Sequence, residues 1–315
     1  MPHDFIASGR HVGNCARSDI IETGRNLFAE CSDGIPLFYW RQPGLKNLGD
    51  VLGKYMVEKM SGLPAIDADP EIHDRILVTI GSVINQARAE QSVFWGSGFI
   101  SASMKPNPRS RYVAVRGPLS GLLLERSGIK APSAIGDPVL LMPLLYRPDR
   151  VRKYRLGIVP HYSDRAGVLR RLDRTCLDEE GDVALINIAT DRVEGFIGLI
   201  CQCDFIVSSS LHGIIIAHAY GIPAVWVEFS DALYGDGMKF KDYFLSVSIP
   251  PYRPHQFKDE VIPIRSLMKL ARRGSTLSRI VNHDPRPLLD CCPFIDDDAR
   301  QRMICALDQG RVASG

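Results

Sequence analysis

The sequence predicts an α/β fold of two Rossmann-like, doubly wound domains. Short apolar runs rich in β-branched residues alternate with longer stretches of helical periodicity, which is the pattern of βαβ units in parallel sheets. The alternation occurs twice, and a charged segment that contains Pro148, residues 146–155, separates the two series. The length of 315 residues also suits two domains. We therefore expect domains over residues 34–148 and 149–250.

The elements follow in order along the chain. The first series predicts strands at 35–39, 76–80, 93–95 and 112–115, with helices over 48–60 and 117–126; the second helix begins at Gly117-Pro118, where proline costs no hydrogen bond. The second series predicts strands at 156–159, 183–187, 205–207 and 224–227, with helices over 164–173, 192–201 and 213–220. Helices over 264–273 and 296–307 complete a C-terminal segment, 251–315. We expect an N-terminal extension, residues 1–33, and the last five residues to be poorly ordered.

The composition excludes several classes of function. The chain carries 38 Lys and Arg against 36 Asp and Glu, and this net charge of +2 gives no general attraction to nucleic acid. No apolar run reaches the ~18 to 20 residues that span a bilayer, and the N-terminus lacks the apolar core of a secretion signal. The eight cysteines form no CxxC pair, which disfavours a zinc site. We expect a cytoplasmic protein without a metal or a cofactor.

Basic residues concentrate at the predicted domain junction. Residues 147–174 hold nine basic and three acidic side chains. Ligands of open α/β sheets bind beyond the carboxyl ends of the strands, so a basic junction favours an anionic ligand. A solvated basic surface is the alternative interpretation.

The segment 204–223 carries the clearest chemical signal. A predicted buried strand leads into Ser208-Ser209-Ser210, and a helix begins near His212. The serines can cap this helix, whose N-terminus favours anions. His212 lies at the carboxyl end of the sheet, where it can transfer a proton near neutral pH, or it serves as a packing or capping residue. His218, inside the same apolar helix, is expected to be structural.

Two strand ends of the first series supply further candidates. Asn47 and Asp50 lie at the first strand-to-helix turn, where either side chain can cap the helix or contact a sugar hydroxyl, and Gly49 permits close approach of the backbone. Arg116 directly follows a strand, where its guanidinium can bind an anion with two hydrogen bonds or form a surface salt bridge.

The second series adds two cations near the same rim. His161 follows the strand at 156–159, so it should lie on the same edge as His212. Lys239 can add an anion contact, although lysines of this kind are ordinary on surfaces. Neither domain contains a Rossmann or Walker phosphate-binding motif, so the sequence gives no support for NAD or ATP.

Six motifs occur in order between residues 35 and 243. They are Asn47-Leu-Gly-Asp50, Val115-Arg-Gly-Pro118, Gly136-Asp-Pro138, Val159-Pro-His-Tyr162, Ser208-Ser-Ser-Leu-His-Gly213 and Lys239-Phe-Lys-Asp242. In order and spacing they resemble the polysaccharide pyruvyl transferase family, in particular the branch that acts in bacterial exopolysaccharide assembly, such as that of succinoglycan. The resemblance implies a GT-B-like fold, in which two Rossmann-like domains face a cleft. It also implies transfer of the pyruvyl group of phosphoenolpyruvate to two hydroxyls of one sugar, with release of phosphate.

The resemblance implies roles for the candidate residues. His212, as an imidazolium, would be the general acid and could also act as the base. Arg116 would hold the carboxylate or phosphate of the donor, while Lys239 or His161 would neutralise the departing phosphate. The implied acceptor is a sugar of a lipid-linked oligosaccharide or a finished chain, which suits loose contact with the inner face of the membrane.

The chain departs from the family pattern at Ser210. Many members carry arginine immediately before the Leu-His pair, so an anion contact expected there must come from Arg116, His161, Lys239 or the basic segment 147–174. Ser210, like Asn47 and Asp50, is expected to contact substrate. Two alternatives remain, because one fold serves many functions: a GT-B glycosyltransferase that uses a nucleotide sugar, and a non-catalytic protein that binds an anion or a saccharide.

Overall fold

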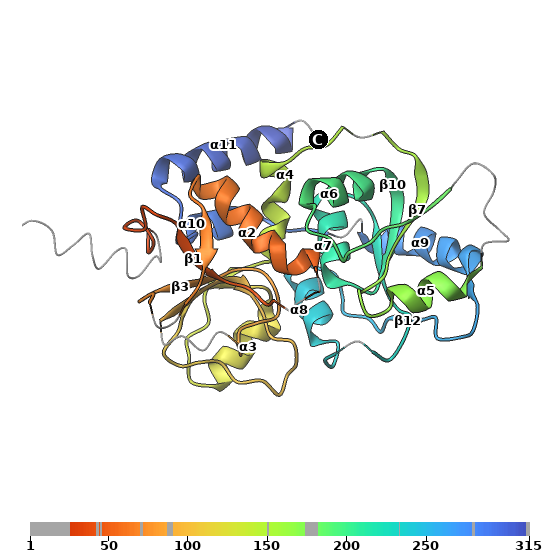
Figure 1. The fold of residues 1–315 in the computed structure, drawn as a ribbon, viewed down its shortest axis with the longest axis horizontal. Helices are drawn as coiled ribbons and strands as arrows, with labels where there is room; N and C mark the ends of the chain where they lie inside the picture. The colour runs from red at the N-terminus through yellow and green to blue at the C-terminus, as the bar shows by residue number, and fades with distance from the viewer. Residues whose placement is uncertain are drawn as a thin grey trace, which may run out of the picture.

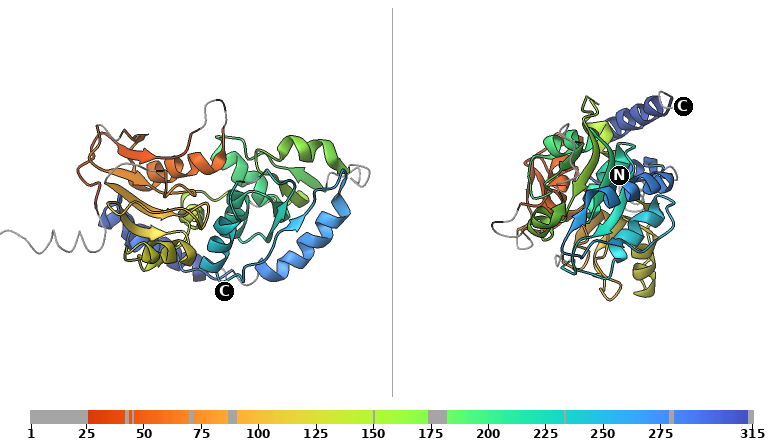
Figure 2. Two further views of the ribbon diagram at one scale, coloured as in Figure 1. Left: turned by 90° about the horizontal axis from the view of Figure 1, so that it is seen from below. Right: turned by 90° about the vertical axis from the view of Figure 1, so that its right-hand side faces the viewer.

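A computed structural model describes residues 26–312 except for 42–43, 45, 70–71, 87–90, 150, 174–181, 233 and 279–280. The chain forms two large parallel sheets in two lobes that lie side by side (Figures 1 and 2). This architecture confirms the predicted fold class of two Rossmann-like α/β domains.

The first sheet has six parallel strands in the order β2-β1-β3-β4-β5-β6. The strands are β1 (Ile35–Phe38), β2 (Ala65–Asp67), β3 (Ile76–Val78), β4 (Ser92–Ser97), β5 (Arg111–Val115) and β6 (Ala134–Ile135). Side chains alternate between the two faces: Leu77 and Trp95 join the core under α2 (Leu48–Ser61), whereas Val78 and Phe94 join the core under α3 (Pro118–Arg126). The order of the strands reverses between β1 and β3, so the ligand-binding position of such a sheet lies there.

The second sheet has five parallel strands in the order β12-β11-β10-β7-β9. The strands are β7 (Tyr154–Val159), β9 (Val183–Leu185), β10 (Cys203–Ser208), β11 (Ala224–Glu228) and β12 (His255–Gln256). The helices are α5 (Arg165–Arg171), α6 (Val193–Cys201), α7 (Leu211–Ala219), α8 (Met238–Ser246) and α9 (Ile264–Ser278). Ile206 of β10 packs with α6 and α7, and Val207 packs with α9 on the opposite face. A short pair, β8 (Leu172–Asp173) and β13 (Ile262–Pro263), flanks this sheet.

The last helices return to the first domain, where α11 (Asp297–Val312) contacts α4 (Met142–Leu145) and α10 (Arg286–Asp290). The short elements η1 (Pro138–Leu141), α4 (Met142–Leu145), α10 (Arg286–Asp290) and α11 (Asp297–Val312) complete the described chain. Trp95 of the first sheet donates a hydrogen bond from Nε1 to the carbonyl of Leu288 in α10 (2.9 Å) and meets the ring of Phe294 edge to face. The predicted C-terminal segment is therefore divided: α9 covers the second sheet, and α10 and α11 cover the first.

The structure also differs from the expectation that the N-terminal residues are poorly ordered. Leu27 and Phe28 are buried in the core, and the amide of Phe28 donates to the carbonyl of Pro293. The expectation of poor order is thus wrong for residues 26–33, while residues 1–25 lie outside the described part of the chain. Helix α8 was not among the helices predicted from the sequence.

Helix α2 joins the first domain to the second. The amide of Leu48 donates to the carbonyl of Ile188 (2.9 Å), and the hydroxyl of Tyr55 donates to the carboxylate of Glu194 (2.8 Å). Just before the helix, Lys46 pairs with Asp191. These contacts place the first turn of α2 against the second domain.

Candidate active site

The first turns of α2 and α7 meet between the domains. A Cβ atom built on Gly49 would lie only 2.3 Å from Nδ1 of His212, so the imidazole rests directly on the backbone of α2. Any larger residue would collide with the ring. The structure therefore brings together the Asn47–Asp50 turn and the Leu211–Gly213 turn. The group that closely approaches the backbone at Gly49 is the imidazole of His212.

The imidazole of His212 is neutral at pH 7. Burial and then the positive charges of Arg116, Lys239 and His161 lower the pKa of His212 to about 3. Its Nε2 atom is buried and makes no hydrogen bond to any described residue. The protein's own charges thus favour a neutral imidazole, which is suited to accept a proton. An imidazolium that forms beside a bound anionic substrate stays a prediction.

Serines fix the start of α7 to strand β7. Ser208 Oγ lies 2.8 Å from the carbonyl oxygen of Val159, to which it donates, and accepts a hydrogen bond from the amide of Ser210 (3.0 Å). Ser210 occupies the N-cap position, but its side chain forms no capping bond. A Cβ on Gly213 would lie 2.6 Å from Ser208 Oγ, so this turn also requires glycine. The serines thus position His212 through the backbone, and a substrate contact by Ser210 stays a prediction.

His161 lies at the end of β7, as expected. Its amide donates to Ser209 Oγ (2.8 Å), and its ring centroid is 4.1 Å from that of Tyr162. Burial and the charge of Lys239 lower the pKa of His161 to about 4. These surroundings favour a neutral His161, and the expected contact of His161 with a phosphate stays a prediction.

Lys239, in the first turn of α8, is the uncompensated cation near His212. Burial and then the charge of Arg116 lower its pKa to about 8. Its ammonium lies 5.5 Å from the ring centroid of Phe240, and it has no ion-pair partner among the described residues. A buried ammonium without a carboxylate favours an anionic ligand.

Arg116 is held inside the protein. Its side chain is fully buried, and its guanidinium donates to Asp242 Oδ2 (3.2 Å from Nε, 3.1 Å from Nη2), to Ser82 Oγ (2.6 Å) and to the carbonyl of Phe99 (2.9 Å). The alternative that Arg116 forms a salt bridge on the surface is wrong, because Arg116 and Asp242 are both fully buried. Direct contact with a substrate would require this ion pair to rearrange, so the predicted donor-binding role is not built into the observed geometry; Arg116 instead acts on the site through its charge.

The side chains of Asn47 and Asp50 bind each other. Asn47 occupies the N-cap position of α2 without a capping bond, and its Nδ2 donates to Asp50 Oδ2 (3.0 Å). Burial raises the pKa of Asp50 to about 6. Burial and then the charge of Asp50 raise the pKa of Tyr162 in the second domain, so the carboxylate faces the same region as His161. The side-chain capping interpretation is wrong, and contact with a sugar hydroxyl stays a prediction.

Sequence reasoning missed Asp242 as a site residue. Asp242 is fully buried on α8, and its carboxylate accepts hydrogen bonds from the amide and the hydroxyl of Ser120 as well as from Arg116. Its signal was present in the Lys239-Phe-Lys-Asp242 motif, which places the aspartate one helical turn after Lys239.

The described residues contain no group of three or more His, Cys, Asp or Glu side chains arranged to hold a metal ion. Within the same described ranges, no helix is long and apolar enough to cross a bilayer.

The comparisons with known sequences give one family model and two relatives. The sequence model described as polysaccharide pyruvyl transferase matches residues 93–231, which include Arg116, His161 and His212. An uncharacterized protein, L143 of Acanthamoeba polyphaga mimivirus, is 32% identical over 206 residues, which cover 62% of this chain and 69% of that protein. The succinoglycan biosynthesis protein ExoV of Rhizobium meliloti (strain 1021) is 29% identical over 231 residues, which cover 70% of this chain and 66% of that protein.

Two solved structures of low similarity cover much of the chain. The wall teichoic acid polymerase TagF is 11% identical, with a TM-score of 0.39, and the match covers 94% of this chain and 95% of that one. The glycosyltransferase SnogD of Streptomyces nogalater is 10% identical, with a TM-score of 0.32, and the match covers 82% of this chain and 76% of that one. The fold assignment rests on the two sheets, and the assignment to a family rests on the sequence matches. By these matches and the motifs gathered around His212, the chain belongs to the polysaccharide pyruvyl transferase family.

Proposed function

We propose that the protein transfers the pyruvyl group of phosphoenolpyruvate to a sugar of an exopolysaccharide or of its lipid-linked repeat unit, forms a cyclic ketal and releases phosphate. Family membership supports pyruvyl transfer to a polysaccharide. The observation that carries the donor assignment is the unpaired ammonium of Lys239 in the electrostatic neighbourhood of His212. Phosphoenolpyruvate acts here as a substrate, and the proposal includes no cofactor.

Lys239 is the proposed ligand of the donor's carboxylate or phosphate. An anion would restore the charge balance that the protein leaves open at this ammonium, and charge-assisted hydrogen bonds of this kind are the stronger ones. The first turns of α7 and α8 add amide donors of helix N-termini. Arg116 contributes positive potential from within its ion pair with Asp242.

His212 is the proposed proton carrier. Neutral at pH 7, its Nε2 accepts the proton of the first sugar hydroxyl and delivers it to the methylene carbon of phosphoenolpyruvate, while the sugar oxygen bonds to the central carbon. The bond between that carbon and the phosphate oxygen then breaks. The second hydroxyl adds to the same carbon, and its proton leaves with the phosphate. The products are one pyruvate ketal and one inorganic phosphate, so atoms and charges balance.

The proposed acceptor is a lipid-linked oligosaccharide that the protein reaches from the cytoplasm in loose contact with the membrane. The basic side chains of residues 147–174 support this placement, because anionic lipid surfaces attract clustered Lys and Arg.

The test is phosphate release from phosphoenolpyruvate by the purified protein, with and without lipid-linked oligosaccharide, followed by the mass of the product. We expect release that depends on acceptor and a mass gain of one pyruvate ketal. His212→Ala should lower turnover by about 10²–10⁴-fold, because a positioned acid or base contributes that much. His255→Ala, at an exposed histidine of β12, is the matched control.

A different result would redirect the assignment. Consumption of a nucleotide sugar without phosphate release would favour the glycosyltransferase alternative, and binding of phosphoenolpyruvate without turnover would favour the non-catalytic one. Normal turnover in His212→Ala would remove His212 from the mechanism.

A further inference from the structure

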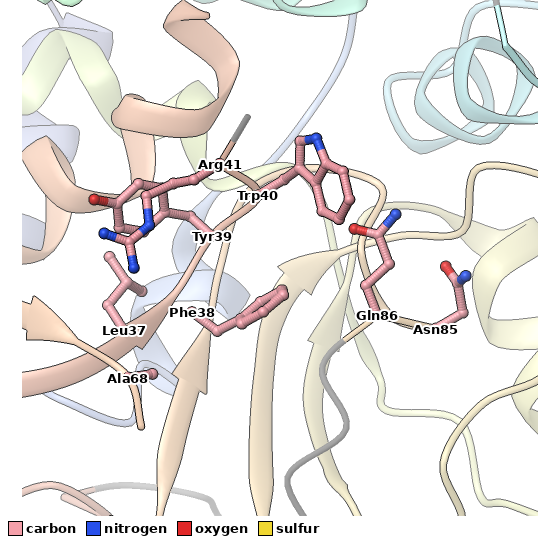
Figure 3. A pocket seen from close by; sticks show the side chains of 8 residues that line it. All are labelled: Leu37, Phe38, Tyr39, Trp40, Arg41, Ala68, Asn85 and Gln86. Carbon is pink, nitrogen blue, oxygen red and sulfur yellow. The ribbon is translucent and has the colours of Figure 1, made fainter. Parts of the chain in front are cut away.

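A concave site lies at the switch point of the first sheet, apart from the His212 cluster, by which we mean the Asn47–Asp50 turn, His161, His212 and Lys239. The pocket has a volume of about 600 Å³ and opens where β1 ends and the chain after β3 turns away (Figure 3). Its lining residues are Leu37, Phe38, Tyr39, Trp40, Arg41, Ala68, Asn85 and Gln86. The strand order reverses between β1 and β3, and this is the position at which open α/β sheets bind ligands.

The pocket offers an aromatic face to solvent. Trp40 is 46% exposed, although large aromatic side chains usually bury most of their surface, and its indole ring points toward Gln86 across the pocket (Figure 3). The two other tryptophans, Trp95 and Trp226, are 0% and 2% exposed. An exposed indole beside a pocket favours a ligand with an apolar face.

The pocket also holds amide groups that lack partners. Asn85 Oδ1 and Gln86 Oε1 are buried, and neither forms a hydrogen bond with a described residue. Buried polar atoms are almost always satisfied, and rotation of these two amides toward the pocket would let ligand hydroxyls satisfy them. Because the oxygen and nitrogen of an amide can exchange places, either end of each side chain can face the ligand.

The charge of the pocket is balanced. Arg41 pairs with Asp67 (2.7 Å) and lies over the ring of Tyr39, with its guanidinium carbon 5.1 Å from the ring centroid. Among the described residues that line the pocket, this pairing leaves no free cation like Lys239, so this lining suits a neutral ligand rather than a phosphate. A sugar ring combines the required features, since it presents C–H groups on its faces and hydroxyls at its edge.

The pocket and the His212 cluster share the loop after β3. Ser82 in this loop accepts a hydrogen bond from Arg116, and Gln86 follows it by four residues, which span at most ~14 Å of extended chain. Resting on the proposed function, we propose that the pocket binds a neutral sugar residue of the acceptor next to the one that receives the pyruvyl group. The protein would then select an oligosaccharide over a monosaccharide.

Trp40 itself provides a binding signal that does not depend on turnover. Acrylamide should quench the fluorescence of exposed Trp40 and leave buried Trp95 and Trp226 largely unaffected. The probes are neutral di- to hexasaccharides of glucose, galactose and mannose. We expect at least one of them to protect Trp40 from quenching, and monosaccharides to protect it less. Absence of protection by every oligosaccharide would overturn the proposal.

Variants test the two sides of the pocket by calorimetry with the protecting oligosaccharide. Trp40→Ala should raise Kd about tenfold, equivalent to about 1.4 kcal/mol, Trp40→Phe should recover part of that loss, and Gln86→Leu should weaken binding as well. Ile72→Ala removes an exposed apolar side chain of the same domain outside the pocket and is the control. Unchanged Kd in both Trp40→Ala and Gln86→Leu would contradict the proposal. Sugar binding without phosphate release would instead contradict only the proposed function.

Discussion

Replacement of Gly49 by alanine tests whether the meeting of α2 and α7 sets the position of His212. The added Cβ would lie 2.3 Å from His212 Nδ1, and relief to an ordinary contact of 3.4 Å requires a movement of about 1.1 Å (3.4 − 2.3). Gly49 lies in the first turn of α2, and the ring belongs to the first turn of α7. Both helices are fixed by other contacts, so the imidazole has to shift or rotate.

The effect on stability should be modest. Insertion of a methyl group into a packed site costs about 1–3 kcal/mol, while the gain in helix propensity from glycine to alanine returns up to about 1 kcal/mol. The effect on catalysis should be larger, because displacement of a reacting group by about 1 Å can cost about 10²-fold in rate. We therefore expect kcat to fall by about two orders of magnitude in a protein that remains folded.

The assay compares Gly49→Ala with Gly198→Ala. A Cβ on Gly198, in helix α6, meets no atom within 4 Å, so this variant adds the same methyl group to a helix without a collision. It should keep full activity and gain about 0.5–1 kcal/mol in the free energy of unfolding. Phosphate release gives kcat and KM, and urea unfolding gives stability. Wild-type kcat in folded Gly49→Ala would refute the argument that this contact positions His212.

Three further changes separate charge, packing and protonation. Lys239→Met should weaken binding of phosphoenolpyruvate about 10–100-fold, measured by calorimetry with Lys241→Met as the control. The affinity of the wild-type protein should fall as the pH rises through 8, because the ammonium of Lys239 then loses its proton. Asp242→Asn should lower the free energy of unfolding by about 3–5 kcal/mol, because the buried guanidinium of Arg116 loses its counter-charge; an equally stable variant in urea would show that the pair is dispensable. Burial lowers the pKa of His218 to about 4, against ~6.5 in the unfolded chain, so between these pH values the unfolded chain binds one more proton than the folded protein. The free energy of unfolding should therefore fall by up to about 3 kcal/mol as the pH drops from 6.5 to 4. Urea titrations of His218→Gln should lack this part of the pH dependence.

Most of the fold was accessible from the sequence because its elements carry strong local patterns. The buried strands of both sheets are short runs of apolar residues, and α2, α6 and α7 follow them at regular spacing, so hydrophobic periodicity and turn residues were sufficient. Strands β2 and β6 span three and two residues, too few to show a period. Leu27 and Phe28 were missed because their burial depends on Pro293 and its neighbours at the other end of the chain.

The edge on which the site lies was predictable, but its protonation states were not. The carboxyl ends of parallel strands meet at one edge, so the positions of His161 and His212 followed from topology. The pKa of His212 depends on burial and on Lys239 and Arg116, which come from helices that the local sequence around His212 does not reveal. Likewise, the partner of Arg116 lies 126 residues away, and no local pattern distinguishes a buried arginine from one that faces a ligand.

Helix α8 determines which of the two cations, Arg116 or Lys239, is held in an ion pair. Asp242 and Lys239 stand three residues apart, so they lie on adjacent turns of the same helical face. Asp242 holds Arg116 in a buried ion pair, and Lys239, with no carboxylate partner among the described residues, retains its charge beside His212. The family arginine that precedes Leu-His is Ser210 in this chain, so the cation of that turn is absent as well. Among the described side chains, the positive charge left for an anionic substrate is that of Lys239. Under the proposed function, we therefore expect binding of phosphoenolpyruvate to depend on the placement of α8 rather than on Arg116.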